Sequence, residues 1–209
     1  MSTAEKLDRV SRRQVDKFEE RRRELADAAL QTLSELGYAR TSLREIAQNS
    51  AFSHGVLHYY FRDKVELITY CVRKYKTECA HRYDKIVATA DTPEDLAAGF
   101  LEALTTTLVD DATMHRLWYD LRSQALFEPS FREDVLEIDA MLERMIWRVL
   151  SRYAELVNAK IAGSSPAVYA MFDGLFQQAL LRQLAGHPNV DGTLRDNVLR
   201  LVAILVPTG

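Results

Sequence analysis

Apolar residues recur every three or four positions along most of the chain, which is the spacing of one face of an α-helix. In the first such stretch Leu25, Leu33 and Leu36 share a face, and Gly37 follows where a left-handed cap would end the helix. No stretch alternates between apolar and polar residues as a half-buried β-strand does. The pattern predicts an all-α protein of about nine helices.

Serine residues mark the start of two short, neighbouring helices. Ser42 can cap the first, with Glu45 three residues later to complete a capping box, and Ser53 can cap the second. Leu57 and Phe61 supply the buried side of the second helix. Two short helices joined by a tight turn are typical of a helix-turn-helix, whose second helix enters the major groove of DNA.

The face of the second helix that points away from Leu57 carries groups that can read DNA. They can hydrogen-bond base edges, touch a thymine methyl or meet a phosphate. They are His54, Gly55, Val56, His58 and Tyr59, with Ser53 at the start of the helix. The two histidines have a spacing that can hold a metal, but neither a neighbouring catalytic Glu nor an obvious third ligand accompanies them. Metal binding is the weaker alternative, and no cofactor is expected.

The rest of the chain predicts longer helices. Asp63 and Glu66 repeat the capping box at the start of a helix that continues to about residue 88. The last helix is apolar almost all round, so one of its faces needs a partner. We therefore divide the chain into three parts. They are a flexible N-terminal arm (residues 1–18), a DNA-binding unit of three helices (19–63) and a larger body (64–209), whose first helix (64–88) links it to the DNA-binding unit.

Charge and cysteine content narrow the function classes. The net charge is −3, yet residues 1–64 hold 12 Lys and Arg against 10 Asp and Glu, so contact with a polyanion belongs to this part. In the arm, Arg9, Arg12 and Arg13 could reach a phosphate, although such a run more often forms a solvated tail. Cys71 and Cys79 cannot build a disulfide framework, and inert packing is the favoured role over redox sensing.

No segment of the sequence reads as a secretion signal or a membrane span, because the longest apolar run is far too short. We expect a soluble, cytoplasmic protein. Nor does a nucleophile elbow, a phosphate-binding glycine loop or a Cys, His and Asp cluster at motif spacing occur, so we do not expect an enzyme.

Aromatic residues are frequent in the body, with polar atoms between them. They could line a ligand pocket, since such sites are mostly apolar with a few placed polar groups, but each could equally be ordinary core. The candidates are Phe100, Trp118, Tyr119, Arg122, Phe127, Trp147, Tyr169, Phe172 and Phe176.

The segment from Thr41 to Leu67 resembles the signature of the Tet repressor family. It reads TSLREIA, then FSHGVLHYYFRDKVEL, with the spacing of that family, and the run YFRDK and the later FDGL are similar to its betaine-responsive repressor branch. The turn holds Ala51 where the family usually has glycine, and the recognition helix holds His58 where it usually has tyrosine. The first departure bears on turn geometry and the second on a phosphate contact.

The resemblance implies a DNA-binding regulator. Its DNA contacts would come from Ser42 and Arg44, from the recognition helix as far as Tyr60, and from Lys64 at a phosphate. We expect a repressor that binds a palindromic operator and is released by a small-molecule effector. An activator of the same family, and a helical ligand-binding protein without DNA binding, are the alternatives.

We expect a homodimer that forms through the last two helices, because the final helix has two apolar sides. The candidate interface residues are Val168, Leu175, Leu194, Val198, Leu201 and Leu205.

Overall fold

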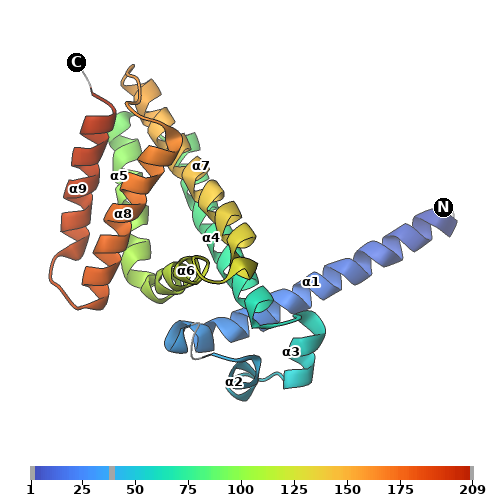
Figure 1. The fold of residues 1–209 in the computed structure, drawn as a ribbon. Coiled ribbons are helices and arrows are strands. Elements are labelled where there is room, and N and C mark those ends of the chain that lie inside the picture. The colour runs from blue at the N-terminus through green and yellow to red at the C-terminus, as the bar shows by residue number, and fades with distance from the viewer. Residues whose placement is uncertain (1–2, 38–40, 208–209) are drawn as a thin grey trace. The chain divides into compact units, whose positions relative to one another are not determined.

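The computed structural model describes residues 3–37 and 41–207, all of whose regular structure is helical (Figure 1). The side chains of residues 3–13 and of Ser34 lie outside that description, and with them the predicted phosphate contacts of Arg9, Arg12 and Arg13. The helices are α1 (Thr3–Leu36), α2 (Leu43–Gln48), α3 (His54–Tyr60), α4 (Lys64–Thr89), α5 (Pro93–Asp110), α6 (Ala112–Gln124), the 3₁₀ turn η1 (Pro129–Phe131), α7 (Arg132–Leu156), α8 (Ser165–Leu184) and α9 (Val190–Leu205). Over these ranges the prediction of an all-α fold is confirmed.

Local sequence sets several of the helix ends. Gly37 adopts a φ of 75° and its N–H donates to the Leu33 carbonyl at 2.8 Å, which closes α1 as predicted. At the start of α5, the Thr92 hydroxyl accepts from the Asp95 N–H at 3.1 Å, and Pro93 occupies the first turn, where its missing N–H is harmless.

The first helix is longer than the sequence analysis expected. Its backbone is helical from Thr3, so residues 3–18 of the predicted arm form an extension of α1. Residues 3–18 contain neither glycine nor proline, and alanine, leucine, glutamate, lysine and arginine are good helix formers. Nothing in this segment ends the helix.

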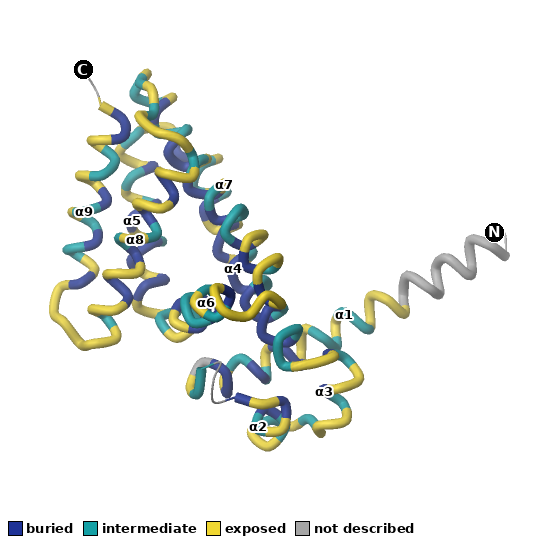
Figure 2. The backbone as a smooth tube through the Cα atoms, viewed as in Figure 1, coloured by how far each residue is buried: buried dark blue, intermediate teal, exposed yellow. Residues whose placement is uncertain are grey.

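The chain forms two compact units, Met1–Val72 and Arg73–Gly209. In the N-terminal unit, α1, α2 and α3 bury one face each, which Figure 2 shows in dark blue. The division falls inside α4 and not before its first residue, because the start of α4 contributes to this core. The core includes Leu25, Leu33, Ile46, Leu57, Leu67, Ile68 and Cys71, each 0% exposed.

In the C-terminal unit, α8 packs against α7 and α9, and α5 contacts α6, α7, α8 and α9. Its core includes Leu108, Trp118 and Val168, each at most 1% exposed. None of the helices over the described ranges combines the length and apolar character needed to cross a membrane.

Replacing Leu57 with alanine tests the core beneath α3. The change removes a side chain that is 0% exposed, and truncations of this kind cost about 2–5 kcal/mol. We expect α2 and α3 to lose amide hydrogen-exchange protection in Leu57→Ala. Leu199→Ala, at a position 46% exposed on α9, serves as the control and should leave the exchange protection of α2 and α3 unchanged. Full protection of α3 in Leu57→Ala would contradict this description of the core.

Candidate nucleic-acid interface and ligand cavity

Side-chain caps fix both helices of the helix-turn-helix. The Ser42 hydroxyl accepts from the Glu45 N–H at 3.2 Å and the Glu45 carboxylate accepts from the Ser42 N–H at 2.7 Å, which is the predicted capping box. The Ser53 hydroxyl accepts from the Val56 N–H at 3.3 Å and caps α3. Ala51 is not among the described residues with positive φ, so this turn does not need the usual glycine.

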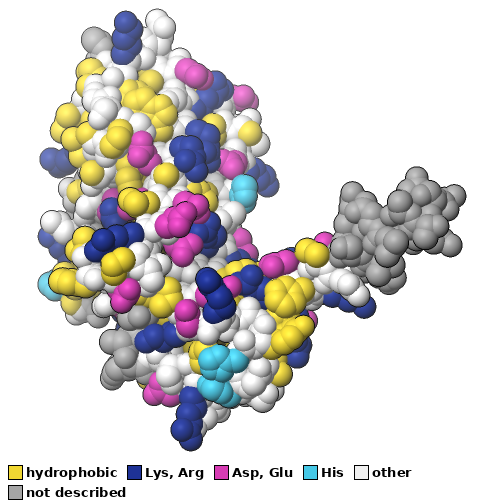
Figure 3. Space-filling view, turned by 45° about the vertical axis from the view of Figure 1, so that its right-hand side comes forward, with side chains coloured by type: hydrophobic (Ala, Val, Ile, Leu, Met, Phe, Trp, Pro, Cys, Tyr) yellow, Lys and Arg dark blue, Asp and Glu magenta, His cyan; other side chains and the backbone are white. Residues whose placement is uncertain are grey.

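The recognition helix α3 buries one side and exposes the other. Leu57 is fully buried, whereas Val56 and Tyr60 are half-buried. Tyr59 is 72% exposed, and the ring centroids of His54 and His58 lie 4.4 Å apart. Figure 3 shows histidine side chains at the molecular surface in cyan. The exposed members of the predicted DNA-reading set are Ser53, His54, Gly55, His58 and Tyr59. The DNA-reading face of α3 is therefore exposed to solvent.

The other predicted DNA contacts lie at two helix starts. Ser42 and Arg44 are exposed at the start of α2, and Lys64 is half-buried at the start of α4. Across the described part of the chain, no three His, Cys, Asp or Glu side chains gather as a metal site would require, so His54 and His58 find no third ligand there.

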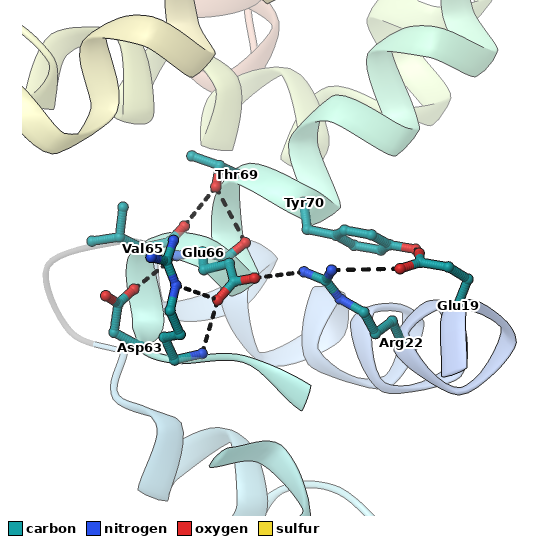
Figure 4. A network of polar contacts seen from close by, with 8 residues as sticks. Glu19, Arg22, Asp63, Val65, Glu66, Thr69 and Tyr70 are labelled. Carbon is teal, nitrogen blue, oxygen red and sulfur yellow. Dashed lines mark hydrogen bonds and ion pairs between the residues drawn. The ribbon is translucent and has the colours of Figure 1, made fainter. Parts of the chain in front are cut away.

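A network of polar contacts holds the start of α4 against α1 (Figure 4). Asp63 Oδ1 accepts from the Glu66 N–H at 2.9 Å and caps α4. The Glu66 carboxylate accepts from the Arg62 N–H at 2.9 Å and from the Arg22 guanidinium at 2.8 Å, and does not close the predicted box onto Asp63. Burial raises the pKa of Glu66, but the hydrogen bonds from Arg62 and the charge of Arg22 outweigh it and lower the pKa overall. Glu66 is ionised at neutral pH.

Arg22 joins three helices at one point. Its guanidinium carbon lies 4.8 Å from the centroid of the Phe61 ring, at the end of α3, and 4.7 Å from that of Tyr70 on α4. Glu19 pairs with Arg22 at 3.6 Å and accepts from the Tyr70 hydroxyl at 3.4 Å. A cation between two aromatic faces is attracted to both, so Arg22 stabilises the position of α3 on α1 and α4.

The middle of α1 also contacts α3 and the turn before it. Phe18, which falls in the predicted arm, has its ring centroid 4.7 Å from Tyr60 and 6.2 Å from Tyr59. Arg21 lies over the ring of Phe52, in the turn, at 4.7 Å. The prediction of a flexible arm over residues 1–18 did not include the contacts of Phe18.

The C-terminal unit contains a cavity of about 80 Å³ between side chains of α4, α5, α6, α7 and α8. Its wall is mainly apolar, as is usual for ligand sites. Of the predicted pocket residues, those that line it are Trp118, Tyr119, Tyr169, Phe172 and Phe176.

The other four candidates lie elsewhere. Phe100 packs edge-on against Phe172 and lines a neighbouring cavity of about 70 Å³. Trp147 is half-buried and lines neither cavity, and Phe127 is 84% exposed. Arg122 does not line the cavity and forms ion pairs with Asp139 and Asp173. Helical periodicity could not separate these positions, because it does not show which of several apolar faces surrounds a void.

A buried polar cluster in this cavity wall was not predicted from the sequence. Lys76 Nζ donates to His115 Nδ1 at 2.9 Å, and His115 Nε2 lies 3.1 Å from the Tyr75 hydroxyl and 3.0 Å from Thr107 Oγ1. Lys76 is 4% exposed and His115 5%. One signal was available, since Lys76 interrupts the apolar stripe of α4.

Burial sets the protonation states of this pair. It lowers the pKa of Lys76 to about 8 and, together with the charge of Lys76, lowers the pKa of His115 well below its usual value. At pH 7 His115 is therefore neutral, accepts at Nδ1 and carries its proton on Nε2. The pair holds one positive charge, on the ammonium group.

A second polar cluster flanks the same cavity. Asp173 forms an ion pair with Arg122 and accepts from the Tyr119 hydroxyl at 2.9 Å. Arg122 also pairs with Asp139 at 3.2 Å, and Asp139 accepts from the Tyr169 hydroxyl at 2.6 Å. Burial raises the pKa of Asp139 despite these partners. Two carboxylates thus share one guanidinium and two hydroxyl donors.

The predicted dimer residues fall into two groups. Leu175 and Leu201 are half-buried and line a surface groove between α8 and α9, which also contains Met171 (47% exposed) and Ile204 (71% exposed). The other four residues are at most 4% exposed in the single chain and belong to its own core. They are Val168, Leu194, Val198 and Leu205. The prediction was wrong for these four, because periodicity shows that a helix has an apolar side but not whether the chain's own core or a partner covers it.

Two segments of the chain match models of known protein families. Residues 25–71 match the family described as bacterial regulatory proteins, tetR family. Residues 93–205, more than half of the chain, match the C-terminal domain of BetI-type transcriptional repressors. This protein belongs to the TetR family. The resemblance in the sequence is therefore confirmed, and so is its similarity to the betaine-responsive branch.

Relatives agree with this assignment. The HTH-type transcriptional regulator BetI of Burkholderia mallei is 28% identical over 174 residues, covering 80% of this chain and 84% of the relative. BetI of Stenotrophomonas maltophilia is 25% identical over 162 residues, covering 77% and 82%. This protein is a TetR-family helix-turn-helix transcriptional regulator.

Solved structures share the fold at lower identity. A TetR transcription regulator from Haloarcula marismortui superposes with a TM-score of 0.73 at 17% identity, covering 90% of this chain and 99% of the other. FadR from Bacillus subtilis, solved in complex with stearoyl-CoA, gives a TM-score of 0.69 at 18% identity, covering 85% and 95%.

Replacing Lys76 with methionine tests the cost of the buried charge. A pKa lowered from 10.5 to about 8 corresponds to about 3 kcal/mol of lost stability below pH 8, because the unfolded chain holds the proton more tightly. We expect Lys76→Met to have a larger free energy of unfolding than the wild-type protein at pH 7. The gain should be about 3 kcal/mol at most, because His115 loses its hydrogen-bond donor in the variant. Between pH 8 and 10.5 the advantage should shrink as folded wild-type protein releases its proton first. Chemical denaturation of both proteins across this range measures the difference, and a variant less stable at every pH would contradict the assignment.

Proposed function

We propose that this TetR-family regulator is a repressor that binds a palindromic operator as a homodimer and is released by a small-molecule effector. The observation that carries the proposal is the solvent-open polar face of α3, held on a core that includes the fully buried Leu57. The C-terminal match to BetI-type transcriptional repressors supports the sign of regulation.

In this proposal, residues 19–63 form the DNA-binding unit. Phosphate contacts from Ser42, Arg44 and Lys64 position the chain. The recognition segment from Ser53 to Tyr60, apart from the buried Leu57, meets base edges in the major groove. Both imidazoles of α3 can donate or accept, and the exposed Tyr59 hydroxyl can do either. The mild excess of Lys and Arg in residues 1–64 supports a salt-dependent attraction to DNA.

Residues 64–209 would sense the effector and form the dimer. The groove between α8 and α9 carries Met171, Leu175, Leu201 and Ile204, and an isologous contact between two copies would cover these apolar side chains. Such a dimer presents two recognition helices to successive major grooves, which are about 34–36 Å apart.

The effector would act through α4. This helix carries Glu66 in the network with α1 and also carries Lys76 and Tyr83 in the cavity wall. A ligand that fits the cavity better when α4 has shifted weakens operator binding, and the operator weakens ligand binding by the same factor.

Selection of genomic DNA fragments by the purified protein, followed by gel shifts, tests DNA binding. We expect enrichment of a palindrome, with affinity that falls steeply as salt rises. Lys64→Ala should weaken binding to all duplexes about equally and reduce the salt slope by roughly one unit, whereas His54→Ala should change sequence preference. Failure to retain any fragment would refute the proposal, and a change of specificity alone in Lys64→Ala would refute its phosphate role.

Charge in the α8–α9 groove tests the dimer. Leu201→Glu and Ile204→Glu place carboxylates where two copies would meet, so we expect monomers in analytical ultracentrifugation and a loss of operator affinity of at least tenfold. Leu181→Glu, at a 70% exposed position of α8 that does not line the groove, is the control. Dimers that persist in both groove variants would exclude this surface.

A further inference from the structure

Lys76 is a cation that the surrounding protein solvates but does not neutralise. Its hydrogen-bond partner is the neutral His115, at 2.9 Å, and its ammonium nitrogen lies 5.6 Å from the ring centroids of Tyr75 and Trp118. Within the described part of the chain, no carboxylate lies within ion-pair distance of this 4% exposed residue. Buried charges are ordinarily paired in direct contact, whereas Asp111, Asp139 and Asp173 attract Lys76 from beyond ion-pair distance.

The acidic groups around the cavity already have cationic partners. Asp111 pairs with Arg82 at 3.2 Å, and Asp139 and Asp173 both pair with Arg122. These two carboxylates also accept hydroxyl hydrogen bonds from the tyrosines of the second polar cluster. The three carboxylates equal Arg82, Arg122 and Lys76 in number, but Lys76 is the cation of this set that has no described carboxylate within ion-pair distance. A ligand with one negative charge would supply that direct partner.

The space beside Lys76 sets the size and polarity of that ligand. The cavity measures about 80 Å³, so its occupant is small or displaces side chains as it enters. Most of the remaining wall is hydrocarbon, which favours an apolar body over a second polar group. The apolar residues of the wall include Leu104, Leu142, Met145, Ile146, Phe172 and Phe176, together with Trp118.

We infer that the effector is a small monocarboxylate with an apolar body, whose carboxylate binds Lys76 while the body lies among the apolar side chains of the cavity. This inference rests on the proposed function, because it names the chemical class of the effector for the same cavity. The ammonium would exchange part of its cation–π contact for an ion pair, and His115 would hold it in place.

Matched ligand pairs test the inference on the full chain. Benzoate and hexanoate are titrated beside benzamide and hexanamide, which keep the shape and lose the charge, and beside choline, which reverses the charge. Binding is followed by tryptophan fluorescence and by the shift in melting temperature. We expect the two carboxylates to bind at least tenfold more tightly than their amides, and choline not to compete with them.

Two variants locate the charge that is responsible. Lys76→Met should weaken carboxylate binding roughly 10- to 100-fold and leave amide binding unchanged, since a hydrogen bond to a charged partner is lost. Lys85→Met removes a positive charge from an exposed position of α4 outside the cavity, and should change neither carboxylate binding nor amide binding. Circular dichroism confirms that both variants are folded. The carboxylate-to-amide comparison in wild-type protein stands even if Lys76→Met does not fold.

Four results would overturn the inference: equal binding of amides and carboxylates, no binding of either carboxylate, preference for choline, or undiminished carboxylate binding in folded Lys76→Met. Fragment binding measured in parallel separates the two proposals. A protein that binds operator fragments but no carboxylate refutes the effector class alone. One that binds carboxylates but no DNA refutes the proposed function alone.

Discussion

The contacts of Arg22 set where the recognition helix lies. With seven residues, α3 is too short to be stable in isolation, so its direction depends on what its ends contact. Arg22, whose side chain is 17% exposed, packs on Phe61 at the end of α3 and on Tyr70, and pairs with the ionised Glu66. Because Glu66 also receives two hydrogen bonds from Arg62, the loop between α3 and α4 is held by the same carboxylate. One cation and one anion thereby connect α1, α3 and α4.

The charge on Lys76 has the opposite relation to stability. Arg22 meets a carboxylate, whereas Lys76 meets a neutral imidazole and aromatic rings, and burial lowers its pKa to about 8. A group that makes folding less favourable and projects into a cavity is a candidate for function, since packing alone would be better served by an apolar side chain. The same helix, α4, carries Glu66 near its start and Lys76 further along, so one element takes part in both the DNA-binding network and the cavity.

The sequence predicts features that depend on neighbours three or four residues apart. The caps at Ser42 and Ser53 and the glycine at the end of α1 are of this kind, and all are confirmed. Features that depend on distant segments were beyond it. Lys76 and His115 are 39 residues apart and meet through side-chain contacts between α4 and α6. The two apolar sides of α9 are distinguished only by what packs against them. The helix-forming composition of residues 3–18 is compatible with an extended α1, but the contacts of Phe18 with Tyr59 and Tyr60 join segments far apart in the sequence, so no local pattern predicts them.

Photo-crosslinking from α3 tests most directly whether its open face meets DNA. Tyr59 is 72% exposed, so a benzoylphenylalanine side chain can replace it without entering the core, and Leu136 on α7, at 66%, provides a matched control position. On irradiation with an enriched genomic duplex, the account predicts a protein–DNA crosslink from position 59 that high salt abolishes, and none from position 136. No crosslink from position 59 under conditions where the duplex is bound would contradict it.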